Sequence, residues 1–266
     1  MEKNIGFIGS GNMGSAMIKG IISSKLIEPG SIYVNDIHKE KLDKLEKNLS
    51  VKTNLNVKKV VKNVEVLVLS VKPNVYKKVL LDIKDYLKKD MLIVTIAAGI
   101  SIDFVENLIG DDKKIIRTMP NTPALVNEGM AALCPNKNII KKELEEVKSI
   151  FESFGKAEVV KESLIDSVIG VSGSSPAYVF KFIEAMADGA VLGGMPRDKA
   201  YKFAAQAVLG SAKMVLETDM HPAELKDMVC SPGGTTIEAI ASLEKQGFSG
   251  TVIEAINKCM DKSKNM

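Results

Sequence analysis

The sequence of 266 residues predicts an α/β fold, with a largely parallel sheet in its N-terminal part and an all-α C-terminal part. Two observations support this prediction. Up to residue 160, short β-branched runs alternate with amphipathic stretches, a pattern typical of parallel α/β domains. From about Glu162 onward the β-branched runs stop and the stretches have helical composition. We therefore expect two domains, at residues 1–160 and 161–266.

The expected strands of the first domain are short and mostly apolar. The clearest is the near-continuous apolar run Val64-Glu-Val-Leu-Val-Leu-Ser70, which is typical of a strand covered on both faces. Strands are expected at residues 4–8, 32–35, 64–70, 92–97, 114–118, 130–133 and 157–160. Helices are expected between them at residues 13–23, 39–48, 74–87, 102–108 and 142–154.

The C-terminal helices indicate a partner subunit. Residues 176–194 and 198–217 are helical in composition and rich in Ala and Gly, and residues 203–212 carry no charge. A helix that is apolar on every side must be buried on every side, and a small helical domain has little volume for this. We expect a homodimer, with further assembly possible; burial by the first domain alone is the alternative. After His221, prolines and glycines predict only short helices.

Composition bounds the function classes. Lys and Arg total 36 against 33 Asp and Glu, giving a net charge of +3 without long blocks, so neither nucleic acid nor a membrane surface is indicated as a partner. No apolar run approaches the roughly 20 residues of a membrane span. Met1 leads into a strand pattern without the charged and apolar regions of a signal peptide, so we expect a cytoplasmic location. Three cysteines without C-x-x-C spacing predict reduced thiols, and with only two histidines no metal site is expected.

A glycine-rich motif predicts a dinucleotide site. Gly9, Gly11 and Gly14 have G-x-G-x-x-G spacing between an expected strand and an expected helix, and Asp36 ends the next strand. The glycines allow a tight turn, close approach of a pyrophosphate and close helix packing, while the helix N-terminus attracts phosphate. In this context the motif predicts a Rossmann-type domain that binds a nicotinamide dinucleotide.

Further segments follow other expected strands. They are Ser70-Val-Lys-Pro73, Ala97-Ala-Gly99 and Met119-Pro-Asn-Thr-Pro123. Ligands bind outside the carboxyl ends of strands in open parallel sheets. We therefore expect these segments to line one crevice, although proline and glycine also terminate strands without any such role.

A second candidate site lies in the helical domain. The segment Ser231-Pro-Gly-Gly-Thr-Thr-Ile-Glu238 places Thr235 and Glu238 at capping-box spacing, which predicts a helix start after a flexible Gly-Gly turn. Free backbone N–H groups at such a turn can hold a small carboxylate. A plain helix cap explains Thr235 and Glu238 equally well, but it does not require the additional Ser, Gly and Thr residues.

Taken together, these motifs resemble those of the pyrroline-5-carboxylate reductase family. The resemblance runs in order along nearly the whole chain, through Ile8-Gly-Ser-Gly-Asn-Met-Gly14, Ser70-Val-Lys-Pro73, Ala97-Ala-Gly99, Met119-Pro-Asn-Thr-Pro123, Ser172-Gly-Ser-Ser-Pro-Ala-Tyr178 and Ser231-Pro-Gly-Gly-Thr-Thr-Ile237. The last motif is the most specific, because other Rossmann reductases share the first. Ser175 and Cys230 depart from the residues usual in the family.

The resemblance implies reduction of the cyclic imine 1-pyrroline-5-carboxylate to L-proline, the final step of proline biosynthesis, with NADPH or NADH. It implies that Thr236 contacts the imine nitrogen. The implied substrate-binding residues are Ser231, Gly233, Gly234, Thr235 and Glu162. The implied cofactor-binding residues are Ile8, Gly9, Ser10, Gly11, Asn12, Met13, Asn35, Asp36, Ser70, Val71, Lys72, Pro73, Ile96, Ala97 and Ala98.

Two alternatives remain open from the residues. One is another Rossmann imine or 3-hydroxyacid reductase, although no lysine motif of the kind that serves those hydroxyacid enzymes as proton donor is apparent in the helical domain. The other is a non-catalytic sensor of NAD(P)H, which would have no need of Thr236. Asp36 also favours a free ribose hydroxyl over a 2′-phosphate, which predicts that NADH serves at least as well as NADPH.

Overall fold

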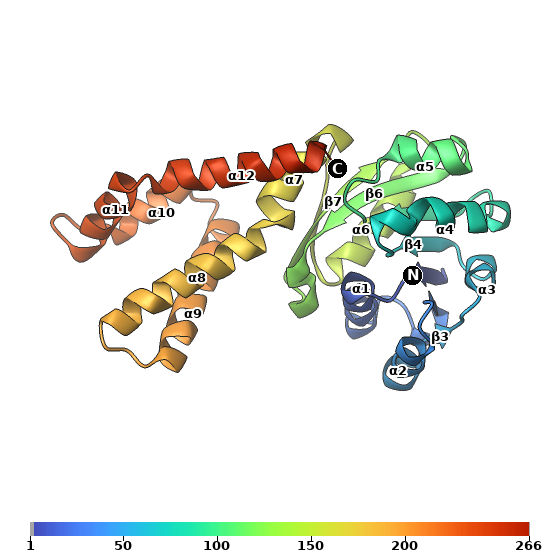
Figure 1. Ribbon diagram of the computed structural model, residues 1–266, viewed down its shortest axis with the longest axis horizontal. Coiled ribbons are helices and arrows are strands. Elements are labelled where there is room, and N and C mark those ends of the chain that lie inside the picture. The colour runs from blue at the N-terminus through green and yellow to red at the C-terminus, as the bar shows by residue number, and fades with distance from the viewer. Residues whose placement is uncertain (1–2, 266) are drawn as a thin grey trace. The chain divides into compact units, whose positions relative to one another are not determined.

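The computed structural model describes residues 3–265 (Figure 1). The chain forms two compact units. The N-terminal unit extends to Gly173 and also takes in the chain from Met260 onward, and the helical unit comprises Ser174–Cys259. Each unit is described by itself.

The N-terminal unit is built on one eight-stranded sheet with the order β3-β2-β1-β4-β5-β6-β7-β8. Strands β1 to β6 are all parallel, β7 is antiparallel to β6, and β8 is parallel to β7. This confirms the predicted largely parallel sheet. The strands are β1 (Ile5–Ile8), β2 (Ile32–Asn35), β3 (Lys52–Thr53), β4 (Val66–Leu69), β5 (Leu92–Thr95), β6 (Lys114–Pro120), β7 (Gly129–Pro135) and β8 (Gly155–Val159).

Seven of these strands match the expected ones, whereas β3 was not predicted. Only two residues of β3 are paired, Lys52 and Thr53, and neither is apolar. A strand this short shows no alternation for a sequence pattern to reveal. Its pairing with β2 depends on the register that the longer strands set.

Helices cover both faces of the sheet. On one face, Phe7 of β1 shares a core with Met17 of α1 (Asn12–Ser23), Leu42 of α2 (Lys39–Leu49) and Val147 of α6 (Lys141–Glu152). On the other, α3 (Val57–Lys62), α4 (Tyr76–Ile83) and α5 (Ile102–Ile109) lie side by side (Figure 1). Because both faces are covered, all four residues of β4 are buried, as its apolar run predicts.

Short helical turns complete this unit. They are η1 (Pro29–Ser31), η2 (Pro73–Val75), η3 (Lys84–Tyr86), η4 (Thr122–Val126), η5 (Glu162–Leu164), α7 (Ile165–Val168) and the π-helical turn η6 (Ile169–Gly173). Three of them, η2, η4 and η5, directly follow a strand.

The helical unit begins with two long antiparallel helices, α8 (Ser175–Leu192) and α9 (Arg197–Glu217), followed by α10 (Pro222–Val229) and α11 (Thr235–Lys245). The last helix, α12 (Phe248–Lys264), runs back along α8 (Figure 1). Phe182 and Phe248 have ring centroids 6.2 Å apart, and the Cys259 thiol lies 3.1 Å from the Ser174 hydroxyl. These two contacts fix the antiparallel pairing of α8 and α12.

Two expectations for this region were wrong. Only short helices were expected after His221, yet α12 has 17 residues, because Gly247 lies just before the helix and no proline follows it. The capping box expected between Thr235 and Glu238 is not formed. Gly234 is the N-cap of α11 and, without a side chain, it caps no backbone N–H group.

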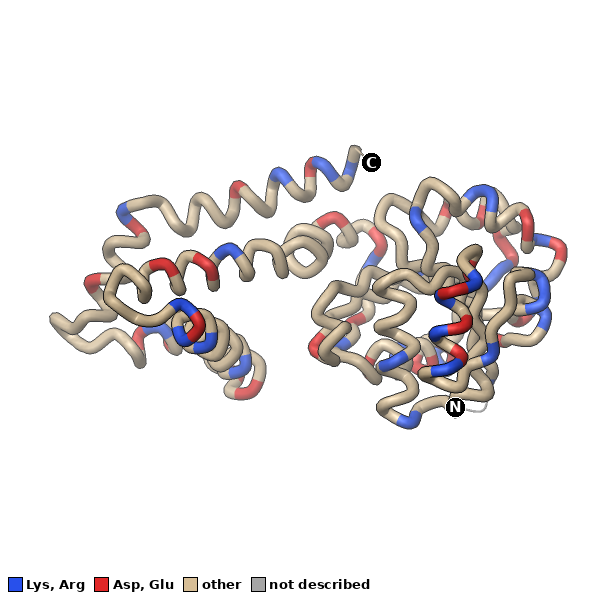
Figure 2. The backbone as a smooth tube through the Cα atoms, turned by 60° about the horizontal axis from the view of Figure 1, so that its bottom comes forward, with Lys and Arg blue, Asp and Glu red and all other residues tan. Residues whose placement is uncertain are grey.

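Much of the surface of α9 is exposed to solvent in the single subunit. Phe203 is 67% exposed and Leu209 is 54% exposed, although both lie in the uncharged stretch. Charged residues are otherwise interspersed in sign along both units (Figure 2). Within residues 3–265, no helix combines the length and apolar character needed to cross a membrane.

Candidate functional site

The glycine-rich loop joins β1 to α1 and has an open side. Gly9 has φ +97°, and a Cβ there would lie 2.6 Å from the Ser70 carbonyl oxygen. A Cβ on Gly14 would lie 2.8 Å from the Gly9 carbonyl oxygen, whereas a Cβ on Gly11 would meet nothing within 4 Å. Gly11 is also the N-cap of α1 and gives no side-chain cap. The free helix N-terminus beside this open space fits a pyrophosphate.

Asp36 braces this loop from the end of β2. Its Oδ2 accepts hydrogen bonds from the Ser10 backbone N–H at 2.9 Å and the Ser10 hydroxyl at 2.7 Å. Its Oδ1 accepts from the His38 N–H at 3.0 Å. Burial raises the pKa of Asp36, but the hydrogen bonds from Ser10 and His38 and the charge of Lys41 outweigh burial and hold that pKa below its ordinary value. The carboxylate is therefore ionised at neutral pH.

Hydrogen bonds draw the ends of β1, β2 and β4 together. The Gly9 N–H donates to the Asn35 carbonyl at 2.8 Å. The Ser70 hydroxyl donates to the Gly9 carbonyl at 2.6 Å, and the Asn35 side chain donates to the Asn54 carbonyl at 2.8 Å. The structure thus brings together many of the expected cofactor residues, namely Ile8, Gly9, Ser10, Gly11, Asn12, Met13, Asn35, Asp36 and Ser70.

The remaining expected cofactor residues follow β4 and β5. Ser70–Pro73 leads from β4 into η2, and Ile96–Ala98 directly follows β5. Tyr76, at the start of α4, connects these two segments. Its hydroxyl donates to the Leu69 carbonyl at 2.5 Å and accepts from the Ile96 N–H at 3.4 Å. Sequence reasoning missed Tyr76, because an aromatic residue on the apolar side of a helix gives only the signal of a core residue.

The segment Met119–Pro123 is fixed by Asn121. The Asn121 side chain donates to the Ser172 carbonyl at 3.1 Å and accepts from the Met130 N–H at 2.8 Å. Asn121 is buried and links the end of β6 to β7 and η6. This segment begins at the carboxyl end of a strand parallel to β5, as expected.

Glu162 lies in the N-terminal unit, in an ion pair with Arg117 of β6. Arg117 Nη1 donates to Glu162 Oε1 at 2.7 Å, and the Ile102 N–H donates to the same oxygen at 2.9 Å. Cys134 lies opposite Arg117 across β6 and β7. Burial, with the negative charge of Glu162, raises the pKa of the Cys134 thiol to about 11, and Arg117 only partly offsets this. Arg117 was not predicted, since a single arginine in a strand shows no spacing pattern.

The turn Ser231–Thr236 belongs to the helical unit, whereas Glu162 belongs to the N-terminal unit. Gly233 has φ +65°, and the Gly234 N–H donates to the Ser231 carbonyl at 3.0 Å. A Cβ on Gly234 would lie 2.6 Å from the Ser231 hydroxyl oxygen. The left-handed backbone at Gly233 favours glycine, whereas a side chain at Gly234 would require the Ser231 hydroxyl to move. It delivers Thr235 and Thr236 to the first turn of α11, where Thr235 is exposed and Thr236 half-buried.

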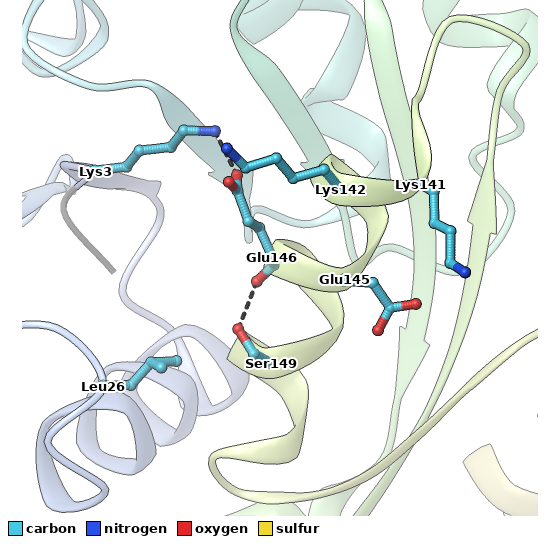
Figure 3. A pocket seen from close by; sticks show the side chains of 7 residues that line it. All are labelled: Lys3, Leu26, Lys141, Lys142, Glu145, Glu146 and Ser149. Atoms are coloured by element: carbon cyan, nitrogen blue, oxygen red, sulfur yellow. Dashed lines mark hydrogen bonds and ion pairs between the residues drawn. The ribbon is translucent and has the colours of Figure 1, made fainter.

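A separate hollow of about 1040 Å³ lies on the N-terminal unit (Figure 3). Lys3 and Glu146 form an ion pair across it, and Ser149 and Leu26 also line it. Lys3 precedes β1, so the hollow is at the amino end of that strand. Ligands of open parallel sheets bind at the opposite end, and this hollow is not the candidate site.

Among residues 3–265, no group of three or more His, Cys, Asp or Glu side chains is placed to hold a metal ion. The fold, the open glycine-rich loop and the ionised carboxylate at the end of β2 define a nicotinamide-dinucleotide-dependent oxidoreductase. Residues 4–99 match the family described as NADP oxidoreductase, coenzyme F420-dependent, and residues 162–266 match pyrroline-5-carboxylate reductase dimerisation.

Comparison with full-length proteins points to the same family as the domain matches. Pyrroline-5-carboxylate reductase of Escherichia coli is 54% identical over 266 residues, covering 100% of this chain and 99% of that one. The structure of a pyrroline-5-carboxylate reductase from Coxiella burnetii superimposes with a TM-score of 0.95 at 34% identity, covering 100% of this chain and 98% of that one. That of the Plasmodium falciparum pyrroline carboxylate reductase with NADP bound has a TM-score of 0.89 at 34% identity, covering 99% and 98%.

The chain belongs to the pyrroline-5-carboxylate reductase family. It is an oxidoreductase that acts on a CH–NH group with NADPH or NADH, and its dimerisation domain makes it a homo-oligomer. This confirms the family, the activity and the cofactor class that its motifs imply.

Proposed function

We propose that this chain reduces 1-pyrroline-5-carboxylate to L-proline, the final step of proline biosynthesis, at residues assigned as follows. The observation that carries the assignment is the turn Ser231–Thr236, whose two glycines present an uncapped start of α11. An uncapped helix N-terminus attracts a carboxylate, and the substrate has one.

The cofactor is assigned to the carboxyl ends of β1, β2, β4 and β5. The open side of Gly11 and the N-terminus of α1 would hold the pyrophosphate. Asp36 would meet the adenosine ribose, and the segments Ser70–Pro73 and Ile96–Ala98 would complete the site. The nicotinamide supplies the hydride for the reaction.

The substrate is assigned to Ser231, Gly233, Gly234, Thr235 and Thr236, with Thr236 as the catalytic residue. The imine binds with its nitrogen protonated, and the Thr236 hydroxyl oxygen accepts a hydrogen bond from that N–H. As the imine carbon gains a hydride, the C=N double bond becomes a single bond and the positive charge on nitrogen is lost. The residue orients the nitrogen and transfers no proton itself. Positioning of this kind supplies several kcal/mol of barrier reduction.

Glu162 is retained in the proposed substrate-binding set. Both hydrogen bonds that it accepts from residues 3–265 end on Oε1, and Oε2 is the oxygen offered to a ligand. Its pairing with Arg117 holds the charge at the junction between β6, α5 and η5.

The assembly proposed is a homodimer formed by the helices of residues 161–266, with further assembly of dimers possible. The exposed apolar side chains of α9 support this, as does the match to the dimerisation family from residue 162. We accordingly propose residues 1–160 as the cofactor domain and 161–266 as the substrate and dimerisation domain. A cytoplasmic location belongs to the same proposal, since Cys134, Cys230 and Cys259 are free thiols. No nucleic acid or membrane partner is proposed.

Thr236→Ala tests the assignment of the hydroxyl. The variant should keep its affinity for NADH and lose about 1.5–3 kcal/mol of transition-state stabilisation, as expected for a hydrogen bond to a charged group. Thr236→Ser keeps the hydroxyl and should retain most of the activity. Thr251→Ala is the matched control, because the Thr251 hydroxyl bonds the Gly247 carbonyl at 3.0 Å in α12, away from the turn. Wild-type kcat/KM in Thr236→Ala would remove Thr236 from the mechanism.

A further inference from the structure

The Tyr76 side chain is fully buried beneath the carboxyl ends of β4 and β5. Its hydroxyl lies 2.5 Å from the Leu69 carbonyl oxygen and 3.4 Å from the Ile96 backbone nitrogen. Burial raises the pKa of Tyr76, so the phenol keeps the proton that it donates to Leu69. The hydroxyl therefore connects the last residue of β4 with the first residue after β5.

At the same edge of the sheet, the neighbouring pairs β1–β2 and β1–β4 end differently from the β4–β5 pair, with a direct backbone hydrogen bond. The residue after β1, Gly9, donates its N–H directly to the last residue of β2 at 2.8 Å. The residue after β4, Ser70, likewise donates to Ile8, the last residue of β1, at 2.9 Å. In each pair the hydrogen-bond ladder continues one step beyond the strands.

The equivalent groups of the β4–β5 pair are the Leu69 carbonyl and the Ile96 N–H. Leu69 pairs with Thr95, and the ladder starts with a direct bond of 2.9 Å from Leu92 to Glu65. In a parallel ladder every second residue of β5 donates to β4, so after Leu92 and Val94 the next donor is the Ile96 N–H and its acceptor is the Leu69 carbonyl. The Tyr76 hydroxyl contacts both groups, and so it is inserted at the last step of the ladder.

We propose that Tyr76 is a positioning residue for the dinucleotide, which sets the separation between the segments Ser70–Pro73 and Ile96–Ala98. Both segments begin within one residue of the groups that the hydroxyl bridges. This inference rests on the proposed function for the assignment of those segments to the cofactor. Tyr76 itself is fully buried, so it acts through these two segments.

Removing the hydroxyl leaves two outcomes for the backbone. The Leu69 carbonyl and the Ile96 N–H either approach each other and bond directly, or they remain buried without a partner. The first outcome moves the two segments towards each other, and the second removes the contact that holds them at a fixed separation. Because both dinucleotides pass the same strand ends, NADH and NADPH should be affected alike.

The test is the affinity of Tyr76→Phe for NADH and for NADPH, measured by nicotinamide fluorescence without substrate. Phenylalanine keeps the ring and removes only the hydroxyl. We expect both Kd values to rise by about tenfold, equivalent to about 1.4 kcal/mol, with an unchanged NADH to NADPH ratio. Under turnover the KM for the dinucleotide should rise more than kcat falls. Hydrogen exchange of the Ile96 amide distinguishes the two outcomes, because it is faster than in the wild type if the amide stays unpaired and not faster if the amide bonds the Leu69 carbonyl directly.

Tyr33→Phe is the matched control. It removes a hydroxyl that accepts from Lys52 at 3.0 Å, at the exposed pairing of β2 with β3, and it should leave both Kd values unchanged. If Tyr76→Phe does not fold, Tyr76→Met takes its place, since methionine fills irregular core space.

Unchanged Kd values in a folded Tyr76 variant, or an equal rise in the control, would overturn the positioning role. A lower melting temperature with unchanged Kd values would show that Tyr76 serves packing only. Because binding is measured without substrate, failure of the proposed function has a different signature: the wild type would bind the dinucleotides and not oxidise them with 1-pyrroline-5-carboxylate.

Discussion

Asp36→Asn should shift cofactor preference from NADH towards NADPH. The Asp36 carboxylate offers about four lone-pair sites, and three are used by the Ser10 N–H, the Ser10 hydroxyl and the His38 N–H. One acceptor site remains, on Oδ1, for a ribose hydroxyl. A 2′-phosphate at that position would face an ionised carboxylate instead.

The size of the shift follows from the kind of bond that is lost. A hydrogen bond to a charged group contributes about 1.5–3 kcal/mol, which corresponds to roughly 10-fold to 150-fold in kcat/KM. We expect NADH to serve the wild type at least as well as NADPH, and the ratio of the two kcat/KM values to move towards NADPH by at least about tenfold in the variant.

Steady-state kinetics with both dinucleotides at saturating substrate measure this ratio. Ser10→Ala separates the two roles of the carboxylate, because it weakens the brace on the loop while keeping the charge, and it should lower both kcat/KM values alike. Glu40→Ala removes one exposed negative charge from the first turn of α2 and controls for net charge. A wild-type preference for NADPH above about tenfold, or an unchanged ratio in Asp36→Asn, would refute the reasoning and show that Lys39 and Lys41 decide the preference.

Three other results are expected. Ala207→Glu should dissociate the oligomer in sedimentation experiments, because an unpaired charge buried at an interface costs several kcal/mol, and an active wild-type monomer would contradict this. Cys134 should resist alkylation at pH 8 in the native protein, since its thiol pKa of about 11 leaves little thiolate, and peptide mass analysis reports it. The folded-state pKa of Asp36 lies below its ordinary value of 3.8; the stability from this group is therefore complete above 3.8 and lost as the pH falls through the folded-state value. In urea unfolding, Asp36→Asn should consequently be closer to the wild type at pH 2 than at pH 7.

The sequence was sufficient for most of the fold because periodicity and glycine spacing are local signals. The run from Val64 to Ser70 predicted a strand buried on both faces, and β4 is buried throughout. The strand β3 lacked such a signal, since it has only two residues, neither of them apolar, and they pair with β2 alone. Thr235 and Glu238 misled for a related reason, because capping-box spacing cannot distinguish a threonine cap from a glycine cap one residue earlier.

The candidate site shows the same limit. Gly9, Gly11 and Asp36 were predicted, because the loop and the end of the next strand have a fixed spacing in dinucleotide folds. The contacts of Asp36 with Ser10 were not, because they depend on how β1 and β2 are placed. Tyr76 was missed because its function depends on the separation of two strand ends, and its helix periodicity indicates only burial.

The central claim is that this chain reduces the cyclic imine, and the most direct measurement is steady-state oxidation of NADH or NADPH on adding 1-pyrroline-5-carboxylate. We expect a decrease in absorbance that depends on the imine, saturates with its concentration, and forms L-proline in equal amount. A 3-hydroxyacid reductase would oxidise the dinucleotide only with the corresponding oxoacid, and a sensor would bind it without turnover. Binding of the dinucleotide without imine-dependent oxidation would contradict the account.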